Sequence, residues 1–313
     1  MRTISNFERN IEKGIDWVIN NYDYFDPYQR KENYPEHISK KSFAEITLIV
    51  FAAKKVEKHL NSVLLNKIEF LSTQILKTLK SPQLYMGIFK NERSFKPMEV
   101  ALLIMLKLHP EDELLNKIVL KAFYSGLFDP CVASAFRHYE VKSFLEMNKL
   151  IEFDNKEKIS LAKQSILGKR QLNLVNMTRL EEYELTHILF YLTEWEKINA
   201  NQIIMELGVN TIQELVLYLT GKNLLLKNND LLAELVMNMV HLNVAHPLLD
   251  QSINTLCEGQ REDGVFEAAS YTYQRALVES TTLRSLVDRD RDVVLNYHTT
   301  FVSIAALLTY YLN

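Results

Sequence analysis

The chain has 313 residues, of which 47% are hydrophobic and 24% are charged, a balance typical of globular proteins. Its formal net charge of -3 argues against general nucleic-acid binding, which usually shows as a strongly basic face. Cys131 and Cys257 lie far apart and form no CxxC pair, which argues against a disulfide framework and a cysteine-rich zinc site. We expect one large domain, residues 1–313.

The sequence contains no segment typical of secretion or membrane insertion. No apolar stretch follows Met1–Asn6, as a secretion signal would require. The longest apolar runs, such as Ile46–Ala53, are far shorter than the roughly 20 residues that cross a bilayer. We therefore expect a soluble cytoplasmic protein that does not associate with membranes or nucleic acid.

Apolar residues recur at helical spacing along most of the chain. They predict a first helix around Ile11–Ile19 and a second around Leu48–Val56. Further helices are predicted at 62–80, 97–108, 111–125, 131–147, 155–167, 180–195, 199–207, 211–220, 229–243, 247–258 and 294–312. No sustained alternation of apolar and polar residues occurs, so we expect almost no strand.

Three long connections separate these helices, at residues 23–40, 82–96 and 259–292. The last has room for a short helix near Gln274–Leu286. Connections of this length are unusual unless they serve as lids or binding segments. All seven prolines fall between predicted helices or in a first turn, where they do least harm.

The predicted helices alternate in character. Segments 67–80 and 156–163 are amphipathic and rich in charge, whereas 99–108, 185–195 and 231–242 are more apolar throughout. A helix that is apolar all round is typically buried, so the alternation predicts two concentric layers. Helix pairs of about 50 residues would fit about six times into the chain. The expected fold is an all-α (α/α)6 toroid.

Two motifs near the C-terminus carry a resemblance to known proteins. Gln260-Arg-Glu-Asp-Gly-Val-Phe266 is similar to the Q-x-x-D-G-x-F/W turn that recurs in terpenoid cyclases and protein prenyltransferase β-subunits. Asn296-Tyr-His-Thr-Thr-Phe301 resembles the Y-H-T segment that opens a late inner helix in the prenyltransferases. Gly14-Ile-Asp-Trp-Val-Ile-Asn-Asn21 resembles the first outer helix of such repeats. The resemblance implies the (α/α)6 toroid superfamily.

A further segment, Glu184-Leu-Thr-His-Ile-Leu-Phe-Tyr-Leu-Thr-Glu-Trp195, resembles one in uncharacterised bacterial proteins of natural-product gene clusters. The chain also departs from its better-known relatives. It has no adjacent Asp-Asp pair, which terpene cyclases need, and no Asp-x-Cys on the helix from Asp230, which prenyltransferases use to bind zinc. His298 alone matches a prenyltransferase zinc-ligand position. The chain is therefore not expected to perform either standard reaction.

Each proposed inner helix has an acid or a histidine near the same end, facing the expected cavity. These candidates are Glu45, Glu99, His138 with Arg137, His187, Glu234 and His298. Unpartnered burial of such groups is costly, and clusters of them often mark functional sites. We assign His187, Glu234, His298 and Glu45 to catalysis, and Glu99, Arg137, His138, Tyr297 and Tyr273 to substrate binding.

Structural roles remain open for these residues. Glu99 could complement the dipole of its helix, because it follows Pro97 in the first turn. A lone histidine on an apolar face is usually a satisfied core residue, Arg137 and His138 could form one exposed pair, and tyrosines at helical spacing are more often core. Asp288-Arg-Asp-Arg-Asp292 is interpreted as a solvated, self-neutralising loop rather than a metal motif.

His187, Glu234 and His298 fall on consecutive inner helices and could converge on a metal ion such as Zn²⁺. Three nitrogen or oxygen ligands with one open position is the arrangement of catalytic zinc. The alternative is general acid–base chemistry in a dry pocket. We expect a biosynthetic tailoring enzyme that acts on a small-molecule or peptide intermediate. The alternative function is a non-catalytic module that binds a peptide or partner protein.

Overall fold

The structure is a computed structural model that describes residues 4–29, 34–89, 97–129, 134–169, 176–197, 202–269 and 286–313. Helices joined by turns account for the described chain, and no strand occurs within it. One isolated antiparallel bridge joins Gln260 to Phe266. The prediction of an all-α protein is therefore confirmed.

Helices run along most of the described chain. The first half contains α1 (Ile4–Asn20), α2 (Tyr22–Phe25), α3 (Glu36–Lys55), α4 (Ser62–Leu79), α5 (Pro82–Phe89), α6 (Glu99–Leu108), α7 (Glu113–Tyr124) and α8 (Ala135–Met147). The second half contains α9 (Asn155–Gln164), α10 (Arg179–Leu192), α11 (Gln202–Leu207), α12 (Val209–Leu225), α13 (Asn229–His241), α14 (Pro247–Glu258) and α17 (Asp288–Tyr310). Short 3₁₀ turns follow α3 at Glu57–His59 and α9 at Ile166–Gly168.

The predicted connections were wrong in part, because each contains helical residues. Helix α3 already begins at Glu36, and α5 begins at Pro82, a residue that suits the first turn of a helix. Asp288-Arg-Asp-Arg-Asp292 is not a loop but the start of α17. Acidic side chains in a first turn complement the positive end of the helix dipole, which explains why this charged segment is helical.

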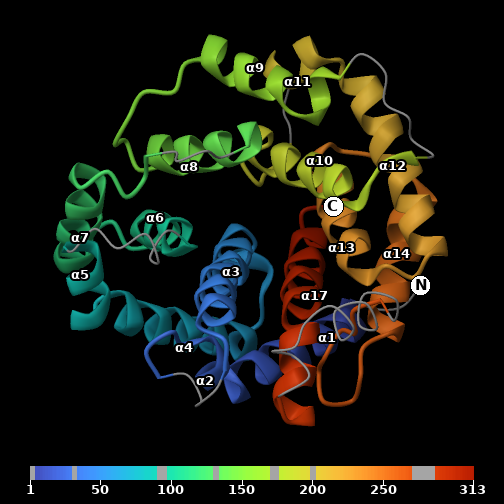
Figure 1. Cartoon of the computed structure of the whole chain (residues 1–313). Coiled ribbons are helices and arrows are strands. Elements are labelled where there is room, and N and C mark those ends of the chain that lie inside the picture. Colours follow the sequence, from blue (N-terminus) through green and yellow to red (C-terminus); the bar gives the residue numbers. More distant parts are fainter. Residues whose placement is uncertain are drawn as a thin grey trace.

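One set of helices surrounds the centre of the molecule (Figure 1). In chain order they are α3, α6, α8, α10, α13 and α17; each contacts the next, and α17 contacts α3. These contacts therefore close into a circle. Helices α4, α7, α9, α12, α14 and α1 lie outside it, and each packs against at least one helix of the inner set.

The sequence explains which helices lie inside. Helix α13 is buried on all sides from Asp230 to His241, and α6 is buried over most of its length. By contrast, α9 buries only Ala162 among its residues, and α4 buries a single stripe. Burying an apolar side chain stabilises the fold by about 1.5–3 kcal/mol, which favours inner positions for α6 and α13.

The outer helices α4, α7 and α9 begin at well-formed N-caps. The side chains of Asn61, Asp112 and Asp154 each accept a hydrogen bond from a backbone N–H in the first turn of the following helix. Thr178 and Glu181 form a complete capping box at the start of inner helix α10. Each such cap typically contributes about 1 kcal/mol and makes the helix start at a defined residue.

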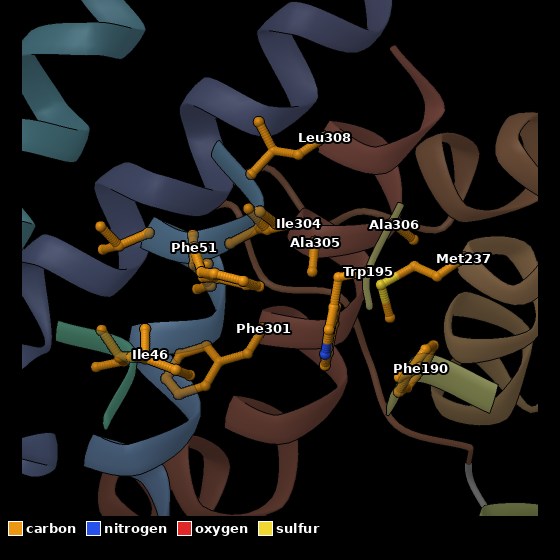
Figure 2. Packing of buried hydrophobic residues seen from close by; sticks show 14 of the residues in the cluster. Ile46, Phe51, Phe190, Trp195, Met237, Phe301, Ile304, Ala305, Ala306 and Leu308 are labelled. Carbon is orange, nitrogen blue, oxygen red and sulfur yellow. The ribbon is translucent and has the colours of Figure 1, made fainter. Parts of the chain in front are cut away.

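Aromatic and aliphatic side chains from several inner helices meet in the centre (Figure 2). The rings of Phe190 and Trp195 stack with their centroids 4.6 Å apart, and Phe51 meets Trp195 edge-on at 6.2 Å. Phe301 and Ile304 of α17 belong to the same cluster. Such aromatic pairs contribute about 0.5–1.5 kcal/mol beyond the area they bury.

The Gln260–Phe266 turn joins both ends of the chain. The Gln260 side chain accepts a hydrogen bond from Asn10 and donates one to its backbone oxygen, at 2.7 Å and 2.9 Å. Gly264 has φ +97°, and a Cβ there would lie 2.2 Å from the backbone oxygen of Lys13. Phe266 N–H donates to Thr300 Oγ1 of α17 at 3.2 Å. The turn therefore ties α1 and α14 to the last helix.

Among the described residues, α17 is the helix that is long and apolar enough to cross a membrane by length and composition alone. In this structure 72% of its apolar window is buried inside the protein. That burial is the behaviour of a core helix in a soluble protein, which agrees with the prediction of solubility.

Candidate functional site

A central cavity of about 840 Å³ lies between the inner helices. Pockets for small molecules typically have volumes of about 300–1,000 Å³. Much of its wall is apolar and comes from several inner helices, including Leu48, Val141, Phe190, Met237 and Phe301. The cavity therefore offers an apolar surface large enough to enclose a compact organic molecule.

Seven of the predicted site residues line this cavity: Glu45, Glu99, Arg137, His138, His187, Glu234 and His298. They come from α3, α6, α8, α10, α13 and α17, so each inner helix contributes at least one. Residues separated by up to 253 positions meet in this way, as in the pair of Glu45 and His298.

The two predicted tyrosines are placed differently. Tyr297 does not line the cavity; its ring packs against Phe25 and Phe301, with centroid distances of 6.2 Å and 5.6 Å. It is only 6% exposed, as expected for a core tyrosine. Tyr273 lies outside the described residues.

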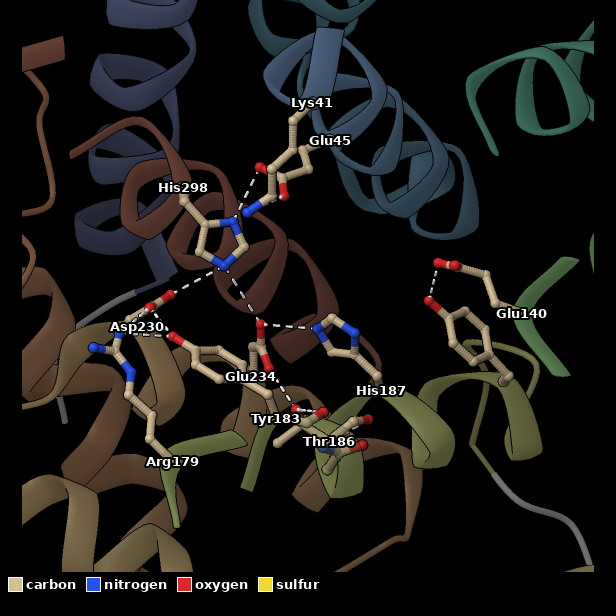
Figure 3. Close-up of polar contacts among 12 residues, drawn as sticks. Lys41, Glu45, Glu140, Arg179, Tyr183, Thr186, His187, Asp230, Glu234 and His298 are labelled. Carbon is tan, nitrogen blue, oxygen red and sulfur yellow. Dashed lines mark hydrogen bonds and ion pairs between the residues drawn. The ribbon is translucent and has the colours of Figure 1, made fainter. Parts of the chain in front are cut away.

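His298 lies between carboxylates on both sides of its ring (Figure 3). Its Nδ1 is 3.0 Å from Oε2 of Glu45, within hydrogen-bonding distance. Its Nε2 faces Oδ1 of Asp230 at 3.3 Å and Oε1 of Glu234 at 3.7 Å. Asp230 and Glu234 are four residues apart on α13, so both project from the same face towards α17.

Glu45, His187, Asp230, Glu234 and His298 form one polar cluster, the His298 cluster. Asp230 is the member that was not predicted from the sequence. Its Oδ2 accepts hydrogen bonds from Arg179, at 3.0 Å, and from the Tyr183 hydroxyl. Its position in the first turn of α13 is the ordinary place for an acid that complements the helix dipole, and nothing in the local sequence distinguishes the two roles.

Glu234 connects His187 to the rest of the cluster. The Thr186 hydroxyl donates to Oε2 of Glu234 at 2.5 Å, while Oε1 lies 3.4 Å from Nε2 of His187. The carboxylate is almost fully buried, with 1% of its side chain exposed, whereas both imidazoles are 24% exposed. A molecule bound in the cavity would therefore contact the imidazole rings of His187 and His298, and the Glu234 carboxylate would act on it through these rings.

The mutual attraction of these charges shifts their pKa values. Burial alone would raise the pKa of Glu45, but Lys41 and His298 outweigh it and lower the pKa to about 2. Burial would likewise lower the pKa of His298, yet Glu45 and Asp230 raise it well above its usual value. For Glu234 the adjacent imidazoles overcome burial and hold the pKa far below the usual range. Glu45, Glu234 and His298 therefore each favour their ionised form in the folded protein.

A second polar group lines another part of the wall. Glu140 accepts hydrogen bonds from Arg137 and from the buried hydroxyl of Tyr191. Arg137 therefore pairs with Glu140, and not with its neighbour His138. Within the described chain, Nε2 of His138 is buried without a hydrogen-bond partner. The charges of Arg137 and Glu140 therefore compensate each other.

Comparison with known proteins places the chain in a family. Residues 11–308 match the model of a family described as "Domain of unknown function (DUF6895)", which covers nearly the whole chain. The chain belongs to the DUF6895 family. No curated protein and no solved structure matches it.

The candidate metal ligands of this DUF6895 protein differ from the predicted set by one residue. Among the described residues, Asp230, Glu234 and His298 can each offer one ligand atom such that all lie within 4.8 Å of one another. His187 approaches Glu234 but is not part of this group. Asp230 therefore stands where the sequence predicted His187.

Proposed function

We propose that the chain is an enzyme of a biosynthetic pathway that acts on a small-molecule or peptide intermediate in the central cavity. One observation carries this proposal: imidazoles and carboxylates gather on one part of a wall that is otherwise largely apolar. Replacing a buried ion pair by apolar residues is often neutral or stabilising. A requirement for stability alone therefore does not account for this group of charged side chains.

The proposed chemistry is the transfer of protons between the bound intermediate and the cluster. His187 supplies the imidazole, and Glu234, 3.4 Å from its Nε2, orients the ring. An imidazole that is held in this way typically contributes about 10²–10⁴-fold to a reaction rate. The apolar remainder of the wall would exclude water and hold the body of the intermediate.

The fold supports the same proposal. The closed circle of α3, α6, α8, α10, α13 and α17, with a second set of helices outside it, agrees with an (α/α)6 toroid. We therefore propose membership of the toroid superfamily, with a site at its centre as in terpenoid cyclases and prenyltransferases. We also propose a cytoplasmic location.

The test uses metabolites from cells that carry a deletion of the gene, because such cells accumulate the unconverted intermediate. Purified protein is added to their extract, and untargeted liquid chromatography–mass spectrometry follows all components with time. We expect the wild-type protein to deplete one component and to form a product. His187→Gln should slow this conversion at least about 100-fold, the lower range of acid–base catalysis. His59→Gln, a change at an exposed histidine outside the cavity, should not.

Two results would overturn the catalytic proposal. If the wild-type protein retained a component through gel filtration and released it unchanged on denaturation, the chain would be a binding module, the alternative function. If conversion proceeded equally with wild type and His187→Gln, the cavity cluster would not be the site of the chemistry.

A further inference from the structure

The geometry points to a divalent metal site formed by Asp230, Glu234 and His298, with Glu45 as the residue that positions the histidine. This inference rests on the proposed function, because it names the group through which the cavity cluster would act. The three ligand atoms lie within 4.8 Å of one another. Ligands about 2.0–2.2 Å from a tetrahedral zinc ion are about 3.3–3.6 Å apart. The observed 3.3 Å and 3.7 Å separations from Nε2 of His298 are close to that spacing.

Each of the three side chains is anchored through one atom and presents another. Asp230 is anchored through Oδ2 by Arg179 and Tyr183 and presents Oδ1. Glu234 is anchored through Oε2 by Thr186 and presents Oε1. Metal ligands in proteins are typically oriented in this way by residues behind them.

His298 follows the same pattern. Its Nδ1 is held by Glu45 at 3.0 Å, and its Nε2 is presented to the two carboxylates. A carboxylate that binds the far nitrogen of a histidine fixes its tautomer and directs the other nitrogen to the metal. The three residues therefore present ligand atoms that lie close together.

The presented oxygen of Asp230 is an independent sign of an absent partner. The Asp230 side chain is only 7% exposed, and Oδ1 is buried without a hydrogen-bond partner in the described part of the chain. Leaving a buried acceptor unsatisfied costs about 1–3 kcal/mol, and more for a charged group. A cation between Oδ1, Oε1 of Glu234 and the imidazole would remove that cost.

A proton on Nε2 of His298 is the rival explanation, but the geometry favours it less. Charge-assisted N–H···O bonds are normally about 2.7–2.9 Å long. The distances from Nε2 are 3.3 Å and 3.7 Å, and neither contact forms a hydrogen bond. The ring therefore stands off from both carboxylates by an amount that suits an ion between them.

The donor set indicates the class of ion. Imidazole with two carboxylates suits zinc and other borderline transition-metal dications better than magnesium, which prefers oxygen ligands and water. The absence of a thiolate separates this set from the Asp-x-Cys zinc site of prenyltransferases. Three protein ligands would leave a position open for water or substrate. His187 lies close to the ligand set, with its Nε2 3.4 Å from Oε1 of Glu234. When bound, the ion would supply a water molecule of lowered pKa beside that imidazole.

The test is zinc binding by the full-length chain. After treatment with chelator, the protein is dialysed against Zn²⁺ and its metal content is measured by mass spectrometry, with affinity from competition with a chromogenic chelator. We expect one zinc ion per chain and much weaker binding of Mg²⁺. Asp230→Asn, Glu234→Gln and His298→Gln should each weaken zinc binding by more than about 100-fold. Glu45→Gln should weaken it by about 10–100-fold, the usual effect of losing a residue that orients a ligand.

Glu140→Gln is the matched control, because Glu140 is a buried cavity carboxylate outside the proposed ligand set. It should leave zinc affinity unchanged. Circular dichroism identifies any variant that has lost its helices. Co²⁺ is then added in place of zinc, and its visible absorption spectrum is recorded. We expect the spectrum of a protein-bound ion with wild type and not with His298→Gln.

Failure of this inference can be distinguished from failure of the proposed function. If wild type bound no zinc, or if folded His298→Gln and Glu234→Gln bound it as tightly as wild type, the metal site would be overturned. Undiminished conversion by the chelated protein would likewise refute the metal's role, yet leave the enzyme proposal standing. Stoichiometric zinc binding without conversion of any component would support the site and overturn the enzyme.

Discussion

His241 makes the stability of this protein depend on pH in a way that can be measured. The residue ends α13, is 1% exposed, and packs against the rings of Phe190 and Trp195 at centroid distances of 6.2 Å and 6.3 Å. Burial, with a smaller contribution from the charge of Lys55, lowers the pKa of His241 from 6.5 to about 3. The folded protein therefore keeps this ring neutral, whereas the unfolded chain protonates it below about pH 6.5.

The sign and size of the effect follow from this difference. As pH falls from about 6.5 towards about 3, only the unfolded state gains the proton, so the free energy of unfolding decreases. The full shift corresponds to about 5 kcal/mol at 1.36 kcal/mol per pKa unit. Between pH 7.5 and pH 5.5 the loss due to this one residue is about 1.4 kcal/mol.

Urea denaturation of wild type and His241→Phe at pH 5.5, 6.5 and 7.5 would test the reasoning. The variant should lose about 1.4 kcal/mol less stability than wild type between the two extremes, since the other titrating groups contribute equally to both proteins. His59→Gln, at an exposed position, should keep the wild-type slope. Parallel slopes for wild type and His241→Phe would refute the buried neutral imidazole.

Three further predictions concern the turn, the cluster and the cavity. Gly264→Ala should cost at least about 2 kcal/mol in urea denaturation, because the residue has φ +97° and its new Cβ would meet the backbone oxygen of Lys13; a loss under about 1 kcal/mol would contradict this. Thr186→Val should cost about 1–3 kcal/mol in the same assay, because Glu234 would lose its hydroxyl donor, and an unchanged midpoint would argue against that bond. Val302→Trp should fill the cavity and abolish conversion in the extract assay while zinc affinity stays at the wild-type value; full activity would mean that the intermediate binds elsewhere.

The sequence determined the class of fold and the burial of the most apolar helices. Helical periodicity is a local property, so the all-round apolar character of Leu231–Leu242 was enough to predict a buried helix. Helical periodicity also singled out Glu234 and His298 as candidate site residues. A charged or titratable residue on an apolar helix requires a partner or a cavity. The N-terminal extent of α3 and α17 was not predictable in this way, since their first turns carry few apolar residues.

Only the tertiary structure decided which of these polar groups meet. Glu45 and His298 are 253 residues apart, and no local pattern relates their positions. Asp230 has the sequence context of an ordinary helix-capping acid, and its role emerges only because α17 brings His298 to within 3.3 Å of it. Periodicity reports how strongly a side chain prefers burial, whereas convergence depends on the rotation and height of one helix against another, which packing across the whole circle of helices determines.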